Sequence, residues 1–300
     1  MAKYQAMKVD PKGFSKDQMK FYAILIPMAI FVALPILFII SHAFKPMNEL
    51  FAYPPRFFVR TPTFENFRDL VQLASQSGIP FSKYLYNSLI VTGLGVFLSV
   101  FVTSLGAYSL SKLKFKGKKL LFEINTLALM FVPIAVTIPR YLTIERLGLI
   151  DTFWVLILPL IAMPVGLFLV KQFIDQTPNE LIESAKIDGA SEMQIFTKII
   201  IPIIAPALAT VGILSFQLLW NDVIGPNLFI DDESMRTLAF YFQTLAALAT
   251  NQAGAGGANM IAGQGIMAAA SLIMFVPNII IFIFLQGKVM NTMAHSGIKS

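Results

Sequence analysis

The chain of 300 residues is 56% hydrophobic and only 13% charged, with a mean hydropathy of +0.70 and a formal net charge of +6. Soluble domains carry about 25% charged residues, so this composition excludes an ordinary soluble domain and indicates a protein that has lipid as its solvent. The absence of cysteine excludes disulfides, thiolate metal sites and cysteine nucleophiles. The two histidines, His42 and His295, lie far apart with no carboxylate pattern around them, which argues against a zinc site or histidine-based catalysis.

Six apolar stretches are long enough to cross a bilayer core of about 30 Å at about 1.5 Å of helix rise per residue. They predict an all-α, polytopic membrane protein with six transmembrane helices. The first stretch is too long for a signal-peptide core and is followed by no small-x-small cleavage site, so we expect it to be retained. The predicted spans are residues 22–44, 86–110, 120–141, 153–174, 199–220 and 264–286.

The third, fourth and fifth spans each carry two prolines. Irregular backbone at membrane depth is tolerated where it packs against protein or lines a water-filled cavity. Proline also merely kinks packed helices, and the sequence leaves both interpretations open. The prolines are Pro133 and Pro139, Pro159 and Pro164, and Pro202 and Pro206.

Lysine and arginine predict the orientation of the chain. With the N-terminus inside, 15 of the 23 basic residues lie in inner segments beside the spans, where the positive-inside rule applies. Both termini and the segment between the fourth and fifth spans are therefore expected in the cytoplasm. The positive charge reflects this orientation, and no nucleic-acid partner is expected. The basic inner loop 112–119 is expected to act as an anchor facing anionic membrane lipid.

Two sizeable loops lie on the outer face in this topology. Residues 45–84 are rich in proline and aromatic residues and are expected to form a short cap over the first two spans. Residues 221–263 contain the acidic run 231–233 and the glycine-rich run 253–257. This second loop is either a docking element or a pliable linker.

A short polar helix is predicted between the fourth and fifth spans. Thr177 is expected to cap it, with Pro178 at the first helical position and Glu180 completing a capping box. Gly189 follows the last helical residue, where a left-handed backbone favours glycine. A second capping box, formed by Ser191 and Gln194, opens the next helix. A helix, a tight turn and a second helix on a polar surface beside a membrane suit docking into a groove of a partner.

This segment also carries a specific resemblance. Glu183-Ser184-Ala185, then Gly189 after three residues, then Ile199 and Pro202 after nine more, resemble the EAA loop of ATP-binding-cassette (ABC) importer permeases. Ser184 replaces the first alanine of that pattern and Ile201 its leucine. The stretch 146–159, the residues around Ala190 and the ending 297–300 resemble the carbohydrate branch of the family, which includes the smaller permease of maltose transporters. The resemblance covers roughly residue 84 to the C-terminus.

The resemblance implies a permease subunit that imports a sugar or oligosaccharide, located in the inner membrane of a bacterial or archaeal cell. It implies three partners: a homologous second permease, a cytoplasmic ATPase dimer that binds ATP and Mg²⁺, and an extracytoplasmic substrate-binding protein. The chain itself would hold no cofactor and have no enzymatic activity. Residues 1–84 would contain the first span and the outer loop, and 85–300 a five-helix transmembrane domain with its coupling loop at about 176–198. The expected ATPase-coupling residues are Leu181, Ile182, Glu183, Ser184, Ala185, Asp188 and Gly189, with the first two and Ala185 providing the apolar contact.

The sequence lacks features that other functional classes of membrane protein require. Proton relays and ion sites need ionisable groups at mid-membrane, whereas Glu123, Arg140 and Asp222 all lie near the ends of spans. Neither Gly-Lys pair has the upstream glycine of a nucleotide-binding loop. No paired carboxylates or Ser/His arrangement suggests a membrane-embedded enzyme. Two alternatives stay open. One is an ABC importer of a solute other than a carbohydrate, and the other is a facilitator or scaffold that works without an ATPase.

A polar and aromatic cluster ends the fifth span. Ser215, Asn221 and Asp222 offer hydrogen bonds that a sugar requires, and Trp220 offers an aromatic face. In a helix, Ser215 and Asp222 would share one face, two turns apart. These four residues are the candidate substrate path. The alternative is an interfacial belt with Trp220 at headgroup level. The polar tail 287–300 is a further candidate contact with the ATPase, or a frayed terminus.

Overall fold

The computed structural model describes residues 16–76, 78–251 and 257–296, and within them the chain forms helices without strands. The N-terminal helices are α1 (Lys16–Ala43), α2 (Met47–Leu50), α3 (Glu65–Gln76) and α4 (Phe81–Lys112). The middle of the chain forms α5 (Lys118–Ala128), η1 (Pro133–Val136), α6 (Thr137–Arg146), α7 (Phe153–Ile161), α8 (Pro164–Asp175), α9 (Asn179–Ile187) and α10 (Glu192–Ile195). The rest forms η2 (Phe196–Ile200), α11 (Ile201–Trp220), α12 (Ile224–Phe229), η3 (Glu233–Met235), α13 (Leu238–Asn251) and α14 (Gly257–Ser296).

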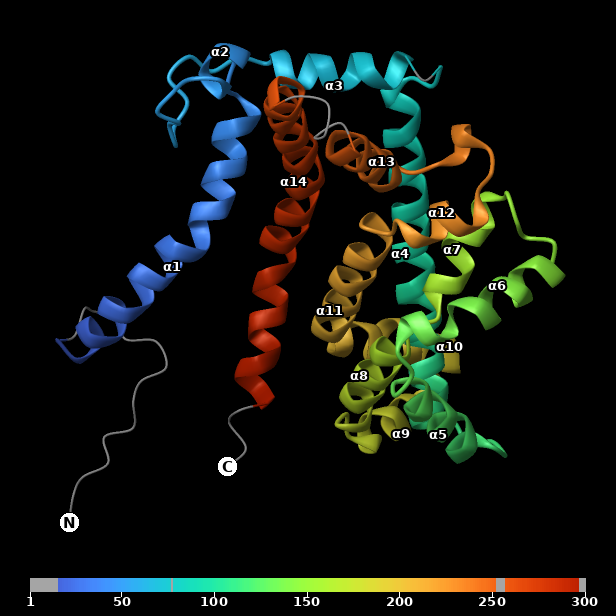
Figure 1. The fold of residues 1–300 in the computed structure, drawn as a ribbon. Coiled ribbons are helices and arrows are strands. Elements are labelled where there is room, and N and C mark those ends of the chain that lie inside the picture. Colours follow the sequence, from blue (N-terminus) through green and yellow to red (C-terminus); the bar gives the residue numbers. More distant parts are fainter. Residues whose placement is uncertain (1–15, 77, 252–256, 297–300) are drawn as a thin grey trace.

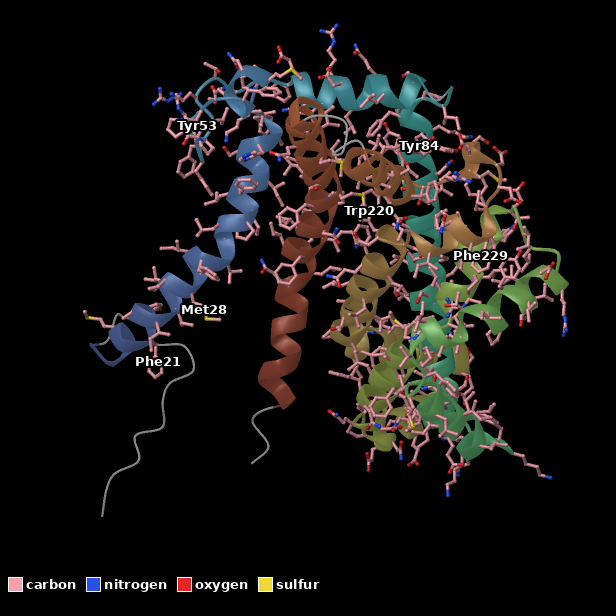
Figure 2. The ribbon with its side chains drawn as sticks, viewed as in Figure 1. Phe21, Met28, Tyr53, Tyr84, Trp220 and Phe229 are labelled. Carbon is pink, nitrogen blue, oxygen red and sulfur yellow. The ribbon has the colours of Figure 1, made fainter. Side chains whose placement is uncertain are left out.

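Helix α4 is the centre of a bundle in which it packs against α7, α8 and α11, while α14 packs against the other side of α11 (Figure 1). Helix α1 stands apart and meets the rest of the chain mainly along α14. Its apolar window contains no buried residue, and Phe21 and Met28 project from it free of the other helices (Figure 2). The apolar window of α1 therefore offers its surface to lipid or to another protein, whereas the end of the helix at Ala43 is buried against α14.

Within the part of the chain that the structure describes, four helices are long and apolar enough to cross a membrane: Phe21–Ala43, Phe81–Lys112, Glu192–Trp220 and a stretch of α14, Gly263–Gly287. They match the first, second, fifth and sixth predicted spans, and the fifth begins seven residues earlier than expected. The other two predicted spans are broken helix pairs. The number of spans is therefore six only if each bent pair crosses the membrane once.

The predicted third span at 120–141 is a broken helix pair, as the irregular-backbone interpretation of its prolines allows. Helix α5 ends at Ala128, and the chain resumes at Pro133 in a direction that makes an angle of 110° with α5. The fourth span bends by 43° between α7 and α8, where Pro164 begins the second helix. Proline disfavours helical backbone in the residue before it, so both breaks precede a proline that starts a new helix. In contrast, Pro159 and Pro206 lie within helices.

The outer loop 45–84 folds into α2 and α3, and α3 lies across the end of the bundle over α14 and α13 (Figure 1). Leu70 of α3 is fully buried beside Tyr84 and Tyr241. Before α3, the carboxylate of Glu49 accepts hydrogen bonds from the hydroxyl of Thr61 at 2.6 Å and from the backbone of the same stretch. These bonds favour the ionised form and lower the pKa of Glu49 to about 2. The sequence predicts a short cap over the first two spans. The cap that α2 and α3 form also covers α14, which contains the sixth predicted span.

The second outer loop contains α12, η3 and α13. Asp151, with a left-handed φ of 59°, accepts hydrogen bonds from the backbone amides of Asp231 and Asp232 at 3.1 and 2.9 Å. The acidic run is thus attached to the connection between α6 and α7. Residues 253–256 of the glycine-rich run lie outside the described residues, as does the ending 297–300, so the expectations for both stay predictions.

Candidate functional site

The predicted docking helix is α9, at the end of the bundle opposite α3 and next to α5 (Figure 1). The prediction that Thr177 and Glu180 form a capping box at its N-terminus is wrong. The helix begins at Asn179, and Pro178 precedes it in an extended conformation that separates Thr177 from the first turn. Lys112 of α4 takes over this end: its ammonium group donates to the carbonyl of Thr177 at 2.7 Å and to Oδ1 of Asn179 at 2.8 Å.

The C-terminus of α9 is formed as the sequence predicts. Gly189 has φ of +78°, its amide donates to the carbonyl of Lys186, and the amide of Ala190 donates to the carbonyl of Ala185. These two bonds define a Schellman motif. The second capping box is also confirmed, since Ser191 and Gln194 exchange side-chain to backbone hydrogen bonds of 2.8 and 3.3 Å. The turn is thus determined by local chemistry alone.

Two of the three residues expected to supply the apolar docking contact face the bundle. Ile182 is 7% exposed and, with the partly buried Ala185, packs into the core formed by α4, α8 and α11. These residues attach α9 to its own chain. Leu181 is 48% exposed, and two residues that the sequence argument missed, Ile187 and Met193, are 86% and 63% exposed. The apolar surface around the turn therefore consists of these three side chains.

The polar candidates of the coupling segment lie on the exposed side of α9. Glu183, Ser184 and Asp188 are all exposed. The hydroxyl of Ser184 donates to the carbonyl of Glu180 one turn earlier, so it serves the helix itself. Glu183 and Asp188 thus place two carboxylates beside the exposed apolar side chains and Gly189.

Glu192 connects the docking segment to the long helix α4. Its carboxylate accepts hydrogen bonds from the hydroxyl of Tyr108 at 2.7 Å and forms an ion pair with Lys186 of α9 at 2.6 Å. Tyr108 is 4% exposed and its ring packs against Phe196, with centroids 5.3 Å apart. We call Tyr108, Lys186 and Glu192 the α9 clamp. The sequence gives little signal for it, because the three residues come from separate elements.

A second link joins α4 to α8 next to the α9 clamp. Asp175, the last residue of α8, accepts hydrogen bonds from the hydroxyl of Ser111 and from Lys171. Lys112, the neighbour of Ser111, holds the start of α9. The end of α4 therefore holds α8, α9 and α10 together through side chains on successive turns.

The candidate substrate-path residues do not form one surface. Ser215 is 1% exposed, and its hydroxyl donates to that of Ser99 on α4 at 3.0 Å. Trp220 is 2% exposed, stacks on Phe216 and donates its indole N–H to the carbonyl of Met274 at 3.0 Å. Both residues thus contribute to packing between helices. The indole of Trp220 is enclosed by its own chain, which argues against the alternative of a lipid-facing interfacial belt.

The prediction that Ser215 and Asp222 share one face of a helix is wrong. Helix α11 ends at Trp220, and Asp222 turns to accept hydrogen bonds from the amides of Ile224 and Gly225. It therefore organises the start of α12. An aspartate in a turn commonly bonds the backbone two or three residues on, and this competes with helix continuation.

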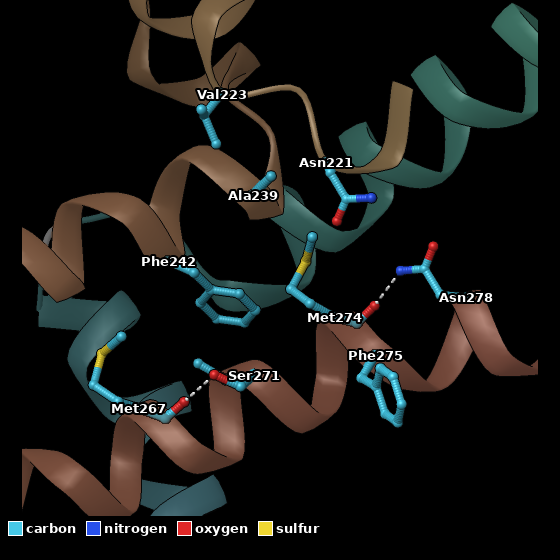
Figure 3. A pocket seen from close by; sticks show the side chains of 10 residues that line it. Asn221, Val223, Ala239, Phe242, Met267, Ser271, Met274, Phe275 and Asn278 are labelled. Carbon is cyan, nitrogen blue, oxygen red and sulfur yellow. Dashed lines mark hydrogen bonds between the residues drawn. The ribbon is translucent and has the colours of Figure 1, made fainter. Parts of the chain in front are cut away.

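Asn221 lines a hollow of about 360 Å³ between the end of α11, α13 and α14 (Figure 3), whereas Trp220 borders a separate, mainly apolar hollow between α4, α11 and α14. Asn278 and Ser271 of α14 also line the hollow at Asn221, together with the rings of Phe242 and Phe275. Both asparagines donate to a carbonyl of their own helix, at 2.8 and 2.9 Å, which leaves each amide oxygen as an acceptor. Two acceptors, a hydroxyl and aromatic faces are groups that bind a polar, hydroxyl-rich solute.

Sequence reasoning missed Ser271 and Asn278 because they lie in an apolar span. The available signal was their spacing of seven residues, which places them on one face of a helix. The described residues contain no group of three or more acidic or histidine side chains placed to hold a metal ion.

The family model described as "binding-protein-dependent transport system inner membrane component" matches residues 95–287, which include α9, the α9 clamp and the cavity. The chain belongs to this family. Among relatives of this inner membrane component is the probable ABC transporter permease protein YurM of Bacillus subtilis, 32% identical over 90% of this chain and 85% of the relative. Another is the trehalose/maltose transport system permease protein MalG of Thermococcus litoralis, 32% identical over 79% of this chain and 81% of the relative.

A solved structure shares the fold of this inner membrane component. It is a crystal structure of a bacterial ABC transporter involved in the import of the acidic polysaccharide alginate. The match has a TM-score of 0.76 at 23% identity and covers 92% of this chain and 99% of the other. Its family membership and its relatives make the chain a membrane permease subunit of the ABC transporter class, in which the ATPase is a separate subunit.

Gly189 offers a test of the α9 turn. The space around it is open, since beyond Gly189 and its two chain neighbours no heavy atom lies within 4 Å of the position that a Cβ would take, so a substitution there strains only the backbone. We expect Gly189→Val to cost about 1–2 kcal/mol and to lower substrate-stimulated ATP hydrolysis of the reconstituted complex. Gly189→Asn should retain most of it, because asparagine tolerates left-handed backbone. Equal stimulation of ATP hydrolysis in both variants and in the wild type would contradict the prediction that the Gly189 turn couples this chain to the ATPase.

Tyr108 offers a test of the α9 clamp. Tyr108→Phe keeps the ring packing and removes a buried hydroxyl donor to a carboxylate, so we expect a loss of about 1–2 kcal/mol of stability. Lys186→Gln should cost less, about 0–1 kcal/mol, because both partners of that pair are about half exposed. Thermal unfolding of the purified complex measures both. A larger effect of Lys186→Gln would show that the ion pair dominates the clamp.

Proposed function

We propose that this chain is one of two permease subunits of an ATP-driven importer for a sugar or oligosaccharide. The family membership supports the transporter class. The substrate class is supported by relatives named for trehalose and maltose and by the fold match to a transporter of alginate. In this proposal the chain binds no cofactor, and a cytoplasmic ATPase dimer binds ATP and Mg²⁺.

The observation that carries the proposal is the exposed turn of α9. Leu181, Ile187 and Met193 present apolar side chains at the end of the bundle, next to the carboxylate of Glu183. An amphipathic helix with projecting apolar residues is suited to a groove of a partner, with charged residues fixing its orientation. The partner that supplies this groove is the ATPase, and Glu183 pairs with a basic residue of it.

Movement of the ATPase subunits reaches the membrane through the α9 clamp. Closure of the ATPase dimer displaces α9, and Glu192 transmits the displacement to Tyr108 on α4 and directly to α11, which continues the same helix. Ile182 keeps α9 in contact with this core during the movement. Alternating access of the helix bundle follows, because α4, α8 and α11 are packed together and move together.

The remaining partners occupy the other surfaces. Helix α1, with no buried residue in its apolar window, provides surface for the homologous second permease and for lipid. The outer side, with α3 and the acidic run 231–233, receives the extracytoplasmic binding protein. Both termini and α9 then lie in the cytoplasm of a cell with an inner membrane. The cavity between α11, α13 and α14 is the part of this subunit that contacts the solute.

Ile187 tests the docking surface. A charge at this position places a carboxylate in the apolar part of the interface, so we expect Ile187→Glu to reduce co-purification of the ATPase with the permease pair by at least tenfold. Ile187→Met keeps an apolar side chain of similar size and should retain the ATPase. Membrane levels of both variants provide the control. Full co-purification and normal stimulated hydrolysis with Ile187→Glu would refute the assignment of this surface.

Asn278 tests the cavity and the substrate class. Loss of one hydrogen bond to a solute costs about 1 kcal/mol, so Asn278→Leu should raise the apparent KM for uptake about fivefold. Uptake of trehalose, maltose and an alginate oligosaccharide by membrane vesicles containing the complex and its binding protein gives the measurement. Asn227→Leu, on the exposed side of α12, is the matched control. If wild-type vesicles take up none of these sugars while a solute of another class is imported, the carbohydrate assignment fails.

A further inference from the structure

A second hollow lies at the α9 end of the molecule, away from the cavity assigned to the solute. It measures about 740 Å³ and is bounded by the end of α4, the loop 113–117, the first turns of α5 and one residue of α8. Its polar lining consists of three lysines and one glutamate, Lys118, Lys119, Lys171 and Glu123. The proposed docking surface and the solute cavity use none of these residues.

The lysines that line this hollow differ in how far nearby carboxylates neutralise their positive charge. Lys118 donates to the backbone carbonyls of Ser111 and Leu113, at 2.7 and 3.2 Å, so it is held in place by neutral groups and keeps its charge available. Lys119 is 92% exposed in its side chain and lies 3.8 Å from Glu123, a weak pair. The hollow therefore holds at least one fixed cationic group without a paired carboxylate.

Lys171 completes the polar lining from α8. It is paired with Asp175 at 2.6 Å and lies over the ring of Phe122, 4.4 Å from its centroid. The surrounding stretch 110–123 carries five lysines against one glutamate. Even with the ion pair of Lys171 and Asp175 satisfied, this corner has a clear positive excess. It fits an anionic ligand.

The other half of the lining is apolar. Leu110, Phe115 and Leu120 contribute to the wall, and the latter two are 42% and 60% exposed. A small soluble anion would leave this apolar surface uncovered, whereas an acyl chain would cover it. A basic pocket between helices at the membrane surface is a recurrent form of binding site for anionic lipid headgroups.

We propose that this hollow binds one anionic phospholipid, with its phosphate at Lys118 and Lys119 and an acyl chain along Phe115 and Leu120. The lipid belongs to the same leaflet as the docking helix; only the naming of that leaflet as cytoplasmic rests on the proposed function.

The position of this lipid connects it to the docking segment. Lys118 is bonded to the backbone of Ser111, the hydroxyl of Ser111 donates to Asp175, and the next residue, Lys112, holds the start of α9. A phosphate at Lys118 is therefore linked through Ser111 to α4. Ser111 is the direct neighbour of Lys112, the residue that positions α9. Occupancy restrains the end of α4 and, through it, the docking helix. ATP hydrolysis coupled to transport should accordingly depend on anionic lipid.

Two double variants of the same loop separate this site from general surface charge. Lys118→Gln/Lys119→Gln removes two lysines that line the hollow, whereas Lys114→Gln/Lys116→Gln removes two that do not. Both change the net charge by the same amount. Native mass spectrometry of the complete purified complex, mixed with phosphatidylglycerol or phosphatidylcholine, counts the lipids that remain bound.

We expect the wild type to retain one phosphatidylglycerol in preference to phosphatidylcholine, and Lys118→Gln/Lys119→Gln to bind it at least tenfold more weakly. The loop control should lose less than twofold. Equal losses in both double variants would overturn the site and leave only a diffuse basic surface. Displacement of the lipid by millimolar inorganic phosphate, with equal affinity for phosphate alone, would overturn the role of the acyl chain.

A third outcome identifies a protein occupant instead. If Lys118→Gln/Lys119→Gln loses the ATPase from the complex in detergent without lipid, the hollow belongs to the protein interface and the lipid assignment is wrong. Lipid counting does not depend on transport. A complex that imports no sugar can still confirm the lipid, and a sugar importer whose retained lipid is unchanged by the variant refutes it.

Discussion

Satisfaction of backbone hydrogen bonds in lipid is the constraint on which this architecture depends. An unpaired amide or carbonyl costs several kcal/mol in hydrocarbon, so the chain forms long helices wherever it faces lipid. The two breaks, before Pro133 and before Pro164, need cover from other parts of the protein. At the second break, Asn125 of α5 donates to the carbonyl of Pro164 at 3.2 Å. This bond attaches α5 to the first turn of α8, directly after the break.

The features that could be predicted from the sequence are those determined over a few neighbouring residues. Gly189 needs its left-handed backbone, and Ser191 and Gln194 cap each other, regardless of what surrounds them. Four long helices follow from apolar length alone. The family resemblance added the partner and the transport class, which no composition argument could supply.

What could not be predicted depends on contacts between distant segments. Thr177 has the right residue type for a cap, but Lys112 from α4 occupies that end of α9 instead. Ser215 and Trp220 are polar or amphipathic residues that suit a solute, yet their partners Ser99 and Met274 come from other helices. Only part of the proposed solute cavity could be predicted, for the same reason: Asn221 lies in a polar run of the sequence, whereas Asn278 joins it only when α14 is placed beside α11.

The division of labour within the docking segment follows from the magnitudes of its contacts. The ion pair of Lys186 and Glu192 is half exposed and contributes about 0–1 kcal/mol. Burial of Ile182 contributes more, about 1.5–3 kcal/mol, but an apolar contact is non-directional and permits the helix to slide. The bond from the buried Tyr108 to Glu192 supplies direction at moderate strength. The coupling role proposed for α9 requires both properties: burial resists detachment of the helix, and the hydrogen bond fixes its register against α4.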